Sequence, residues 1–259
     1  MSETLKVVSY NLRMWQDDWD GVNSFKHRIG MVFEKIQKEQ PDIIGFQEVL
    51  PEMHVFLERL LLEYQLVGQF REANFLGEGT FIAVKKDTLQ VLEYNTFWLS
   101  PMPYVPGSRF QQQSDCPRIC NVVRLRCRRT NRIFRVYNLH LDHVGEEARV
   151  KGMQCILDDL SARNKMEYLP CLILGDFNAE PDSAAIRLCK LYREAPLTDL
   201  TWNFPVTYHG YGETQGVKID YIFGTREFFG CLKSVKLWKD SHCGIYLSDH
   251  YPVCAEFNF

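Results

Sequence analysis

Short apolar segments that end in polar residues recur along the chain, and they restrict its fold more than any other feature. The segment "DIIGFQE" (42–48) is nearly continuous in apolar residues and ends in a carboxylate, and "LPCLILGDF" (169–177) follows the same pattern. Runs of this length are typical of strands buried in sheets that helices cover. The sequence therefore predicts an α/β protein with large sheets.

Helical segments separate the strand-like ones. Apolar residues recur at helical spacing between Ser24 and Gln40, and Pro41 ends the pattern. Further helices are expected at 51–62, 146–163 and 182–192. Strands are expected at 5–12, 42–48, 64–69, 79–86, 89–100, 118–127, 133–141, 169–177, 218–224, 232–238 and 251–259. No repeat, low-complexity tract or linker interrupts this order, so we expect a single domain over residues 1–259.

Composition narrows the class of protein. The net charge of −3 gives no overall basic field, so a nuclease of this sequence would need a local basic patch. The first residues lack a signal-peptide pattern, and no apolar window approaches the roughly 18–20 residues of a membrane span. Nine cysteines are scattered without a CxxC pair. We expect reduced thiols in a cytoplasmic protein.

Polar side chains gather at the ends of five expected strands and, in a sixth case, within a strand. Any one of them alone is typical of a turn or a helix cap. Six such places together indicate a functional site at one edge of the sheets. The candidates are Asn11, Glu48, His140, Asp176, Asn178, Asp220, Asp249 and His250.

The segment "NLHLDH" raises the alternative of a zinc site. It resembles the H-x-H-x-D-H pattern of zinc hydrolases, but Asn138 stands where the first histidine is required. The carboxylates and amide oxygens among the candidates are instead hard ligands, which suit Mg²⁺, with Mn²⁺ as a substitute.

The ordered motifs "SYNLR", "QEV", "NLHL", "GDFN", "IDYIF" and "SDHYPV" resemble those of the endonuclease/exonuclease/phosphatase superfamily. This superfamily includes pancreatic deoxyribonuclease, abasic-site endonucleases, deadenylases, neutral sphingomyelinases and inositol-polyphosphate phosphatases. The resemblance spans nearly the whole chain. It implies a four-layer α/β sandwich, in which two mixed β-sheets pack face to face between helices. The "FWLSP" segment and the unbroken "NLHL" are most similar to the deadenylase-like and uncharacterised bacterial branches.

The resemblance also implies how a divalent ion is held. Glu48 is expected to bind the ion directly, with Asn11 beside it and Asp249 close by. The abasic-site endonucleases carry a metal-linked aspartate two residues after the first asparagine, but this chain has Arg13 there. An arginine favours contact with a phosphate over a second metal.

The remaining motif residues are expected to carry the chemistry. Asp176 would orient or deprotonate the attacking water, and Asn178 would hold the water or the phosphate. His250 would pair with Asp220, which fixes its tautomer and favours its protonated form. His140 would donate a hydrogen bond to the phosphoryl oxygens.

Two further residues are candidates for substrate binding. Arg118 begins a strand after a flexible loop and fits either a phosphate contact or a surface ion pair. His209 lies in the glycine-containing loop "TYHGYG" before the Asp220 strand and could border the substrate or pack in a turn. Asp142 and His143 are interpreted as residues at the entry to the helix that follows them.

Three functions are compatible with this pattern. The favoured function is a Mg²⁺-dependent phosphodiesterase that acts on RNA, DNA or a nucleotide, and the alternative is a phosphatase or phosphodiesterase for a small metabolite or lipid headgroup. The arginines between residues 124 and 128 alternate with apolar residues, as in a strand with one solvated face, so they do not argue for nucleic acid. A non-catalytic binding module is disfavoured because every catalytic position is filled. The sequence gives no indication of oligomeric state.

Overall fold

Two six-stranded mixed sheets form the centre of the computed structural model, which describes residues 4–194 and 196–259. Residues 1–3 and 195, which the expected single domain includes, lie outside the described residues. The first sheet has the order β11 (Leu232–Leu237), β14 (Val253–Asn258), β1 (Thr4–Asn11), β2 (Ile43–Val49), β4 (Gly79–Lys85) and β3 (Tyr64–Phe70). The second has the order β5 (Leu89–Trp98), β6 (Ile119–Cys127), β7 (Ile133–His140), β8 (Cys171–Asp176), β10 (Asp220–Gly224) and β9 (Thr198–Asp199).

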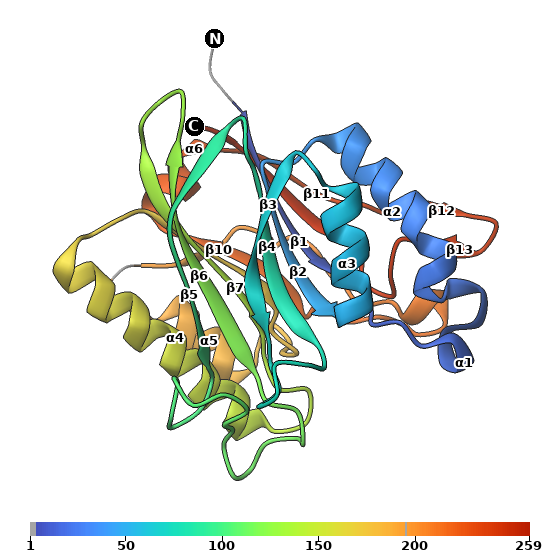
Figure 1. The fold of residues 1–259 in the computed structure, drawn as a ribbon. Helices are drawn as coiled ribbons and strands as arrows, with labels where there is room; N and C mark the ends of the chain where they lie inside the picture. The colour runs from blue at the N-terminus through green and yellow to red at the C-terminus, as the bar shows by residue number, and fades with distance from the viewer. Residues whose placement is uncertain (1–3, 195) are drawn as a thin grey trace.

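Helices cover the outer face of each sheet, as Figure 1 shows. Helices α2 (Phe25–Glu39) and α3 (Pro51–Leu60) pack on the first sheet, and α4 (Glu146–Met166) and α5 (Ala184–Lys190) pack on the second. Apolar side chains from both sheets share one core between their inner faces, for example Val7 and Ile43 with Val136 and Leu174. The predicted four-layer α/β sandwich is thus confirmed.

Local signals in the sequence account for the main helix boundaries. Helix α2 ends where Gln40 adopts a left-handed backbone and donates its N–H to the carbonyl of Ile36 at 2.8 Å, directly before Pro41. Helix α3 begins at Pro51, whose missing N–H costs nothing in a first turn. Helix α4 runs three residues beyond the expected end, because no proline or glycine occurs before Pro170.

Short elements were not predicted. These are α1 (Asp17–Asp20), α6 (Arg226–Cys231), strand β9, and the two-residue strands β12 (Ser241–His242) and β13 (Ile245–Tyr246). Elements of this length are too short to show a hydrophobic period. None of the described helices is long and apolar enough to cross a membrane.

Strand register places the polar strand ends next to one another. Strands β7 and β8 are parallel and pair His140 with Asp176, while antiparallel β10 pairs Asp220 with Asp176. In the first sheet, β1 and β2 are parallel, so Asn11 ends beside the residue that precedes Glu48. The carboxyl ends of four strands therefore meet at one edge of the sandwich.

Candidate active site

A cavity of about 560 Å³ opens at this edge, between the two sheets. Eight of the predicted residues line it: Arg13, Glu48, Arg118, His140, Asp176, Asn178, Asp249 and His250. Asn11 and Asp220 do not line it themselves, but each forms a hydrogen bond with a residue that does. His209 is apart from this group.

Glu48, Asp176 and His250 form the centre of the cavity. One ligand atom of each lies within 4.8 Å of the others, which is a spacing that a single metal ion can bridge. The buried Asn11 holds two of them, because its Nδ2 donates to Glu48 Oε1 and to Asp176 Oδ2, both at 3.0 Å. Its Oδ1 accepts from the backbone N–H of Arg13 at 2.9 Å. In this arrangement Asn11 orients the carboxylates and turns its own oxygen away from the centre.

Glu48 is held in a conformation that its residue type rarely adopts. Its φ of 59° lies in the left-handed region, at an irregularity in the pairing of β2 with β4. Burial disfavours the ionised carboxylate, but Arg13 and the hydrogen bonds from Asn11 and the Met14 N–H outweigh it and lower the pKa of Glu48. The side chain is therefore an anion that faces the cavity.

For Asp176 and Asp249, the other carboxylates of the centre, positive partners and hydrogen bonds do not outweigh burial. Burial, followed by the nearby Asp220, raises the pKa of Asp176 to about 7, and burial also raises the pKa of Asp249. Several buried carboxylates with too few positive partners are the expected surroundings of a divalent cation. The donor set, with hard oxygen atoms and one imidazole, fits Mg²⁺ or Mn²⁺ better than zinc.

His250 and Asp220 form the predicted pair. His250 Nδ1 lies 2.8 Å from Asp220 Oδ2, and its Nε2 lies 3.9 Å from Asp176 Oδ2 on the cavity side. Burial alone would lower the pKa of His250, but the carboxylates of Asp220, Asp249 and Asp176 outweigh it and raise the pKa well above 6.5. The ring can therefore present a charged N–H donor to the cavity.

His140 has the opposite protonation preference. Its Nε2 lies 3.5 Å from Asp176 Oδ2. Burial and the positive charges of Arg118 and Arg71 lower its pKa well below 6.5, so the imidazole is neutral. On the other side of Asp176, the backbone N–H of Asn178 donates to Oδ1 at 2.8 Å, and Asn178 Nδ2 donates to the carbonyl of Leu141 at 3.1 Å.

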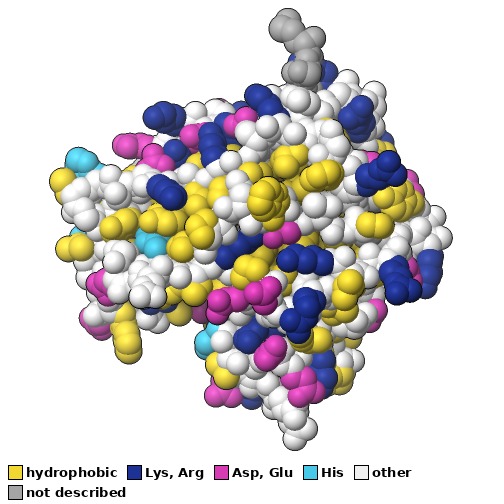
Figure 2. Space-filling model, turned by 180° about the vertical axis from the view of Figure 1, so that it is seen from behind, with side chains coloured by type: hydrophobic (Ala, Val, Ile, Leu, Met, Phe, Trp, Pro, Cys, Tyr) yellow, Lys and Arg dark blue, Asp and Glu magenta, His cyan; other side chains and the backbone are white. Residues whose placement is uncertain are grey.

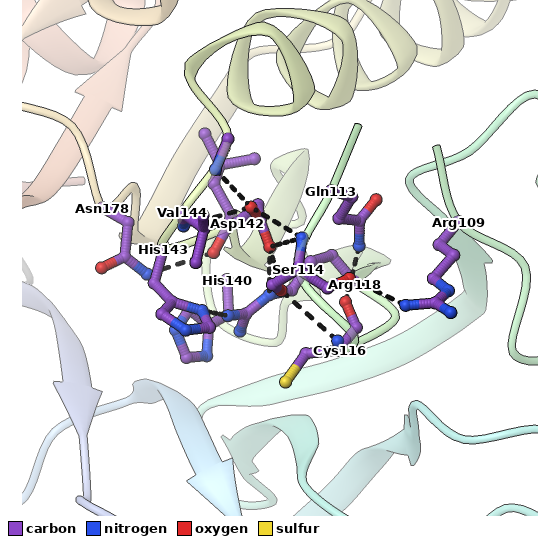
Figure 3. Close-up of polar contacts among 12 residues, drawn as sticks. Arg109, Gln113, Ser114, Cys116, Arg118, His140, Asp142, His143, Val144 and Asn178 are labelled. Atoms are coloured by element: carbon purple, nitrogen blue, oxygen red, sulfur yellow. Dashed lines mark hydrogen bonds and ion pairs between the residues drawn. The ribbon is translucent and has the colours of Figure 1, made fainter. Parts of the chain in front are cut away.

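The basic wall of the cavity is built around Arg118 (Figure 3), which is buried and not in a surface ion pair. Its Nη2 lies 2.7 Å from His143 Nδ1, and its Nε lies 3.7 Å from Asp142 Oδ1. Asp142 accepts from the backbone N–H of Val144 and of Gly145 directly before α4, which agrees with its predicted place at the helix entry. His143 differs from that interpretation, because it lines the cavity.

Two predicted substrate-binding residues have other partners. The guanidinium of Arg13 is bound to Asp20, with Nη2 3.1 Å from Oδ1, although it still borders the cavity. The ring of His209 stacks on Tyr251 at 3.9 Å and does not line the cavity.

Sequence reasoning missed Arg71, Glu78 and Tyr208, which also line the cavity. Arg71 and Glu78 flank the connection between β3 and β4, where charged residues are normal in an exposed hairpin. Tyr208 precedes His209 and packs its ring against His250 at 5.0 Å. No local pattern distinguishes these residues, because a distant segment of the chain brings each into the site.

The fold and this acid–histidine centre at the sandwich edge together define a DNase I-like protein. The chain belongs to the endonuclease/exonuclease/phosphatase family, whose model matches residues 21–250. The resemblance inferred from the motifs is therefore confirmed, and the chain is a phosphoester hydrolase of this family's type.

Known proteins of several kinds are similar to the chain. An endonuclease/exonuclease/phosphatase from Bacteroides vulgatus has a TM-score of 0.90 and 28% identity, with 98% of each chain covered. A mannosyl-6-phosphatase from Bacteroides thetaiotaomicron has a TM-score of 0.84 and 25% identity, with 97% of this chain and 98% of that one covered. Nocturnin from Drosophila melanogaster is 29% identical over 190 residues, which are 66% of this chain and 27% of nocturnin.

Proposed function

We propose that the protein is a Mg²⁺-dependent hydrolase of small phosphate monoesters, with Mn²⁺ as a substitute ion and water as the nucleophile. The observation that carries the proposal is the convergence of Glu48, Asp176 and His250 within 4.8 Å in one buried cavity. We also propose that residues 1–259 act as one catalytic domain in the cytoplasm, as the sequence predicts.

Glu48 and Asp249 are the groups that would hold the cation, and Asn11 keeps Glu48 aligned with Asp176. When bound, the cation supplies positive charge that polarises a phosphoryl oxygen and offsets the charge of the transition state. Arg13 is 3.9 Å from Asp249 and contributes positive charge at the same end of the cavity.

The protein's own groups would position and activate the water. Asp176, with a pKa near 7, can accept a proton from the attacking water at neutral pH. His250 stays protonated beside Asp220 and donates from Nε2 to a phosphoryl oxygen opposite the water. His140 and Asn178 flank Asp176 and would complete the contacts to the water and the phosphate. In this scheme catalysis comes from positioning and charge stabilisation around an in-line attack.

The surroundings of the centre favour a small substrate over a polymer. Figure 2 shows one face of the molecule, on which Lys and Arg side chains are interspersed with Asp and Glu and form no continuous basic band. On the cavity wall, Arg71 is paired with Glu78 and therefore adds little net positive charge for a polyanion. Similarity over 97% of the chain to a mannosyl-6-phosphatase supports the same choice.

Cleavage of a phosphodiester in RNA, DNA or a nucleotide is the second candidate. The observation in its favour is the buried Arg118, which lines the cavity and could contact a phosphate beside the scissile one. Such an enzyme should bind less tightly as salt rises, whereas a small monoester should respond weakly.

The first test compares p-nitrophenyl phosphate with bis-(p-nitrophenyl) phosphate in Mg²⁺, in Mn²⁺ and in EDTA. We expect hydrolysis of the monoester with either ion, loss of turnover in EDTA, and recovery when Mg²⁺ is added in excess. Turnover that persists in EDTA would contradict the metal-dependent mechanism. Cleavage of the diester alone would favour the second candidate.

Replacing Glu48 by glutamine should raise the Mg²⁺ concentration needed for half-maximal activity by at least about tenfold. The amide keeps the shape of the side chain but removes its negative charge, and changes around metal sites commonly cost roughly 10–100-fold in affinity. Titration of activity and of thermal stability with Mg²⁺ measures the change. Glu52→Gln, on the exposed first turn of α3, is the matched control and should leave both curves unchanged. An unchanged Mg²⁺ requirement in Glu48→Gln would remove Glu48 from the proposed metal site.

A further inference from the structure

Arg71 and Glu78 stand side by side on the cavity wall and have no part in the mechanism above. We propose that this pair binds hydroxyl groups of the leaving group, so that the preferred substrate is the phosphate monoester of a sugar or another polyol. This inference rests on the proposed monoester hydrolysis and adds the class of substrate to it.

Hydrogen bonds within the protein fix Arg71 and Glu78 in the cavity wall. Arg71 Nη1 donates to Glu78 Oε2 at 2.6 Å, and the backbone N–H of Arg71 donates to the carbonyl of Glu78 at 3.0 Å. Only 8% of Arg71 and 9% of Glu78 are exposed. The carbonyl of Arg71 accepts from Trp98 Nε1 at 2.6 Å, which fixes the loop to the second sheet. Both side chains are therefore held in place before any substrate arrives.

Polar atoms of this wall remain without partners. Within the described ranges, Arg71 Nε is buried and has no hydrogen-bond acceptor, although the Glu72 carboxylate is 3.6 Å away. Arg118 Nε and Nη1 are also buried and have no hydrogen-bond acceptor among the described residues. Buried donors normally have partners, so this part of the wall holds donors whose hydrogen bonds the protein itself does not supply.

The charges of this wall favour hydroxyl groups beside Arg71 and Glu78 and a phosphoryl oxygen beside Arg118. Arg71 and Glu78 neutralise each other and offer donors beside a carboxylate acceptor. A hydroxyl group both donates and accepts, so neighbouring hydroxyls match this pair, whereas an ionised phosphate only accepts and offers no donor to Glu78. Arg118 differs, because Asp142 beside it already accepts from Ser114 and from the Val144 and Gly145 N–H groups. Arg118 thus suits a phosphoryl oxygen.

The position of the pair fits a group attached to the phosphate. Arg71, Glu78, Arg118 and His140 together line a small recess that adjoins the main cavity. His140 in turn lies 3.5 Å from Asp176 at the reaction centre. A cavity of about 560 Å³ is large enough for a monosaccharide phosphate. A phosphate at the centre would therefore place the first carbon atoms of its alcohol beside the pair.

The test compares two monoesters with similar alcohol leaving groups, mannose 6-phosphate and hexyl phosphate, in Mg²⁺. For the unaltered protein we expect kcat/KM at least tenfold higher for the sugar phosphate. In Glu78→Gln, this ratio should fall about tenfold, while kcat/KM for hexyl phosphate changes less than threefold. Glu63→Gln is the matched control, because its side chain is exposed and outside the cavity lining, and it should keep the original ratio.

Three results would overturn the inference. Equal kcat/KM for the two esters in the unaltered protein would show that hydroxyl groups are not recognised, and this measurement needs no variant to fold. Equal losses on both esters in Glu78→Gln, at an unchanged melting temperature, would make the pair structural. Cleavage of bis-(p-nitrophenyl) phosphate without either monoester would overturn the substrate class and leave a hydrolase. The proposed monoester hydrolysis itself fails only if neither monoester is hydrolysed in a metal-dependent way.

Discussion

His250→Ala is expected to lower kcat by about 10²–10⁴-fold while the protein remains folded. The proposed role of His250 is to donate a charged N–H to a phosphoryl oxygen. Its pair with Asp220, at 2.8 Å, sets the tautomer, and the surrounding carboxylates keep the ring protonated. Alanine removes this donor from a buried site where water cannot replace it with the same geometry.

The measurement is kcat on p-nitrophenyl phosphate with saturating Mg²⁺, together with the melting temperature. His242→Ala is the matched control, because His242 is exposed in the short strand β12 near the C-terminal end and should leave kcat unchanged. Asp220→Asn tests the pair from the other side, since it keeps a hydrogen-bonding group but removes the charge that favours the imidazolium. A folded His250→Ala protein with more than a tenth of the normal kcat would contradict the assigned role.

Much of the fold could be predicted because its signals are local. Pro41 and Pro51 mark helix boundaries that the structure reproduces, and buried strands such as β2 and β8 are continuous apolar runs. The gathering of Asn11 with Glu48 in one sheet, and of His140 with Asp176 in the other, was also accessible. Parallel strands carry their carboxyl ends to the same edge, so polar residues at those ends converge whatever the details of packing.

Other features of the site depend on contacts that no local pattern encodes. Asn11 belongs to the first sheet but donates to Asp176 of the second, so its orientation depends on how the sheets face each other. Arg71 and Glu78 enter the cavity because Trp98 binds their loop to the second sheet. His143 is exposed, yet its Nδ1 contacts Nη2 of the buried Arg118. A sequence shows the residue types at these positions but not these distant partners.

Asp176→Asn should reduce kcat by about 10²–10⁴-fold and should maintain or raise stability in the absence of metal. The carboxylate is the proposed proton acceptor, and an amide of the same shape cannot accept the proton. In the metal-free protein the raised pKa of about 7, against an ordinary 3.8, means that the native state favours the protonated form. The ionised group therefore destabilises the fold progressively as pH rises from about 4 to about 7, and asparagine removes this cost.

A loss of activity combined with retained or increased stability would distinguish a catalytic role of Asp176 from a structural one. At pH 8 in EDTA, the melting temperature of Asp176→Asn should equal or exceed that of the unaltered protein, and excess Mg²⁺ should stabilise the variant less. Asp182→Asn, in the exposed loop after β8, is the control and should change neither activity nor metal response. A variant that lost both activity and stability in EDTA would show that Asp176 supports the fold through Asn11 and Asn178. Because the destabilising charge of Asp176 is the one that accepts the proton, we expect activity and metal-free stability to oppose each other at this residue.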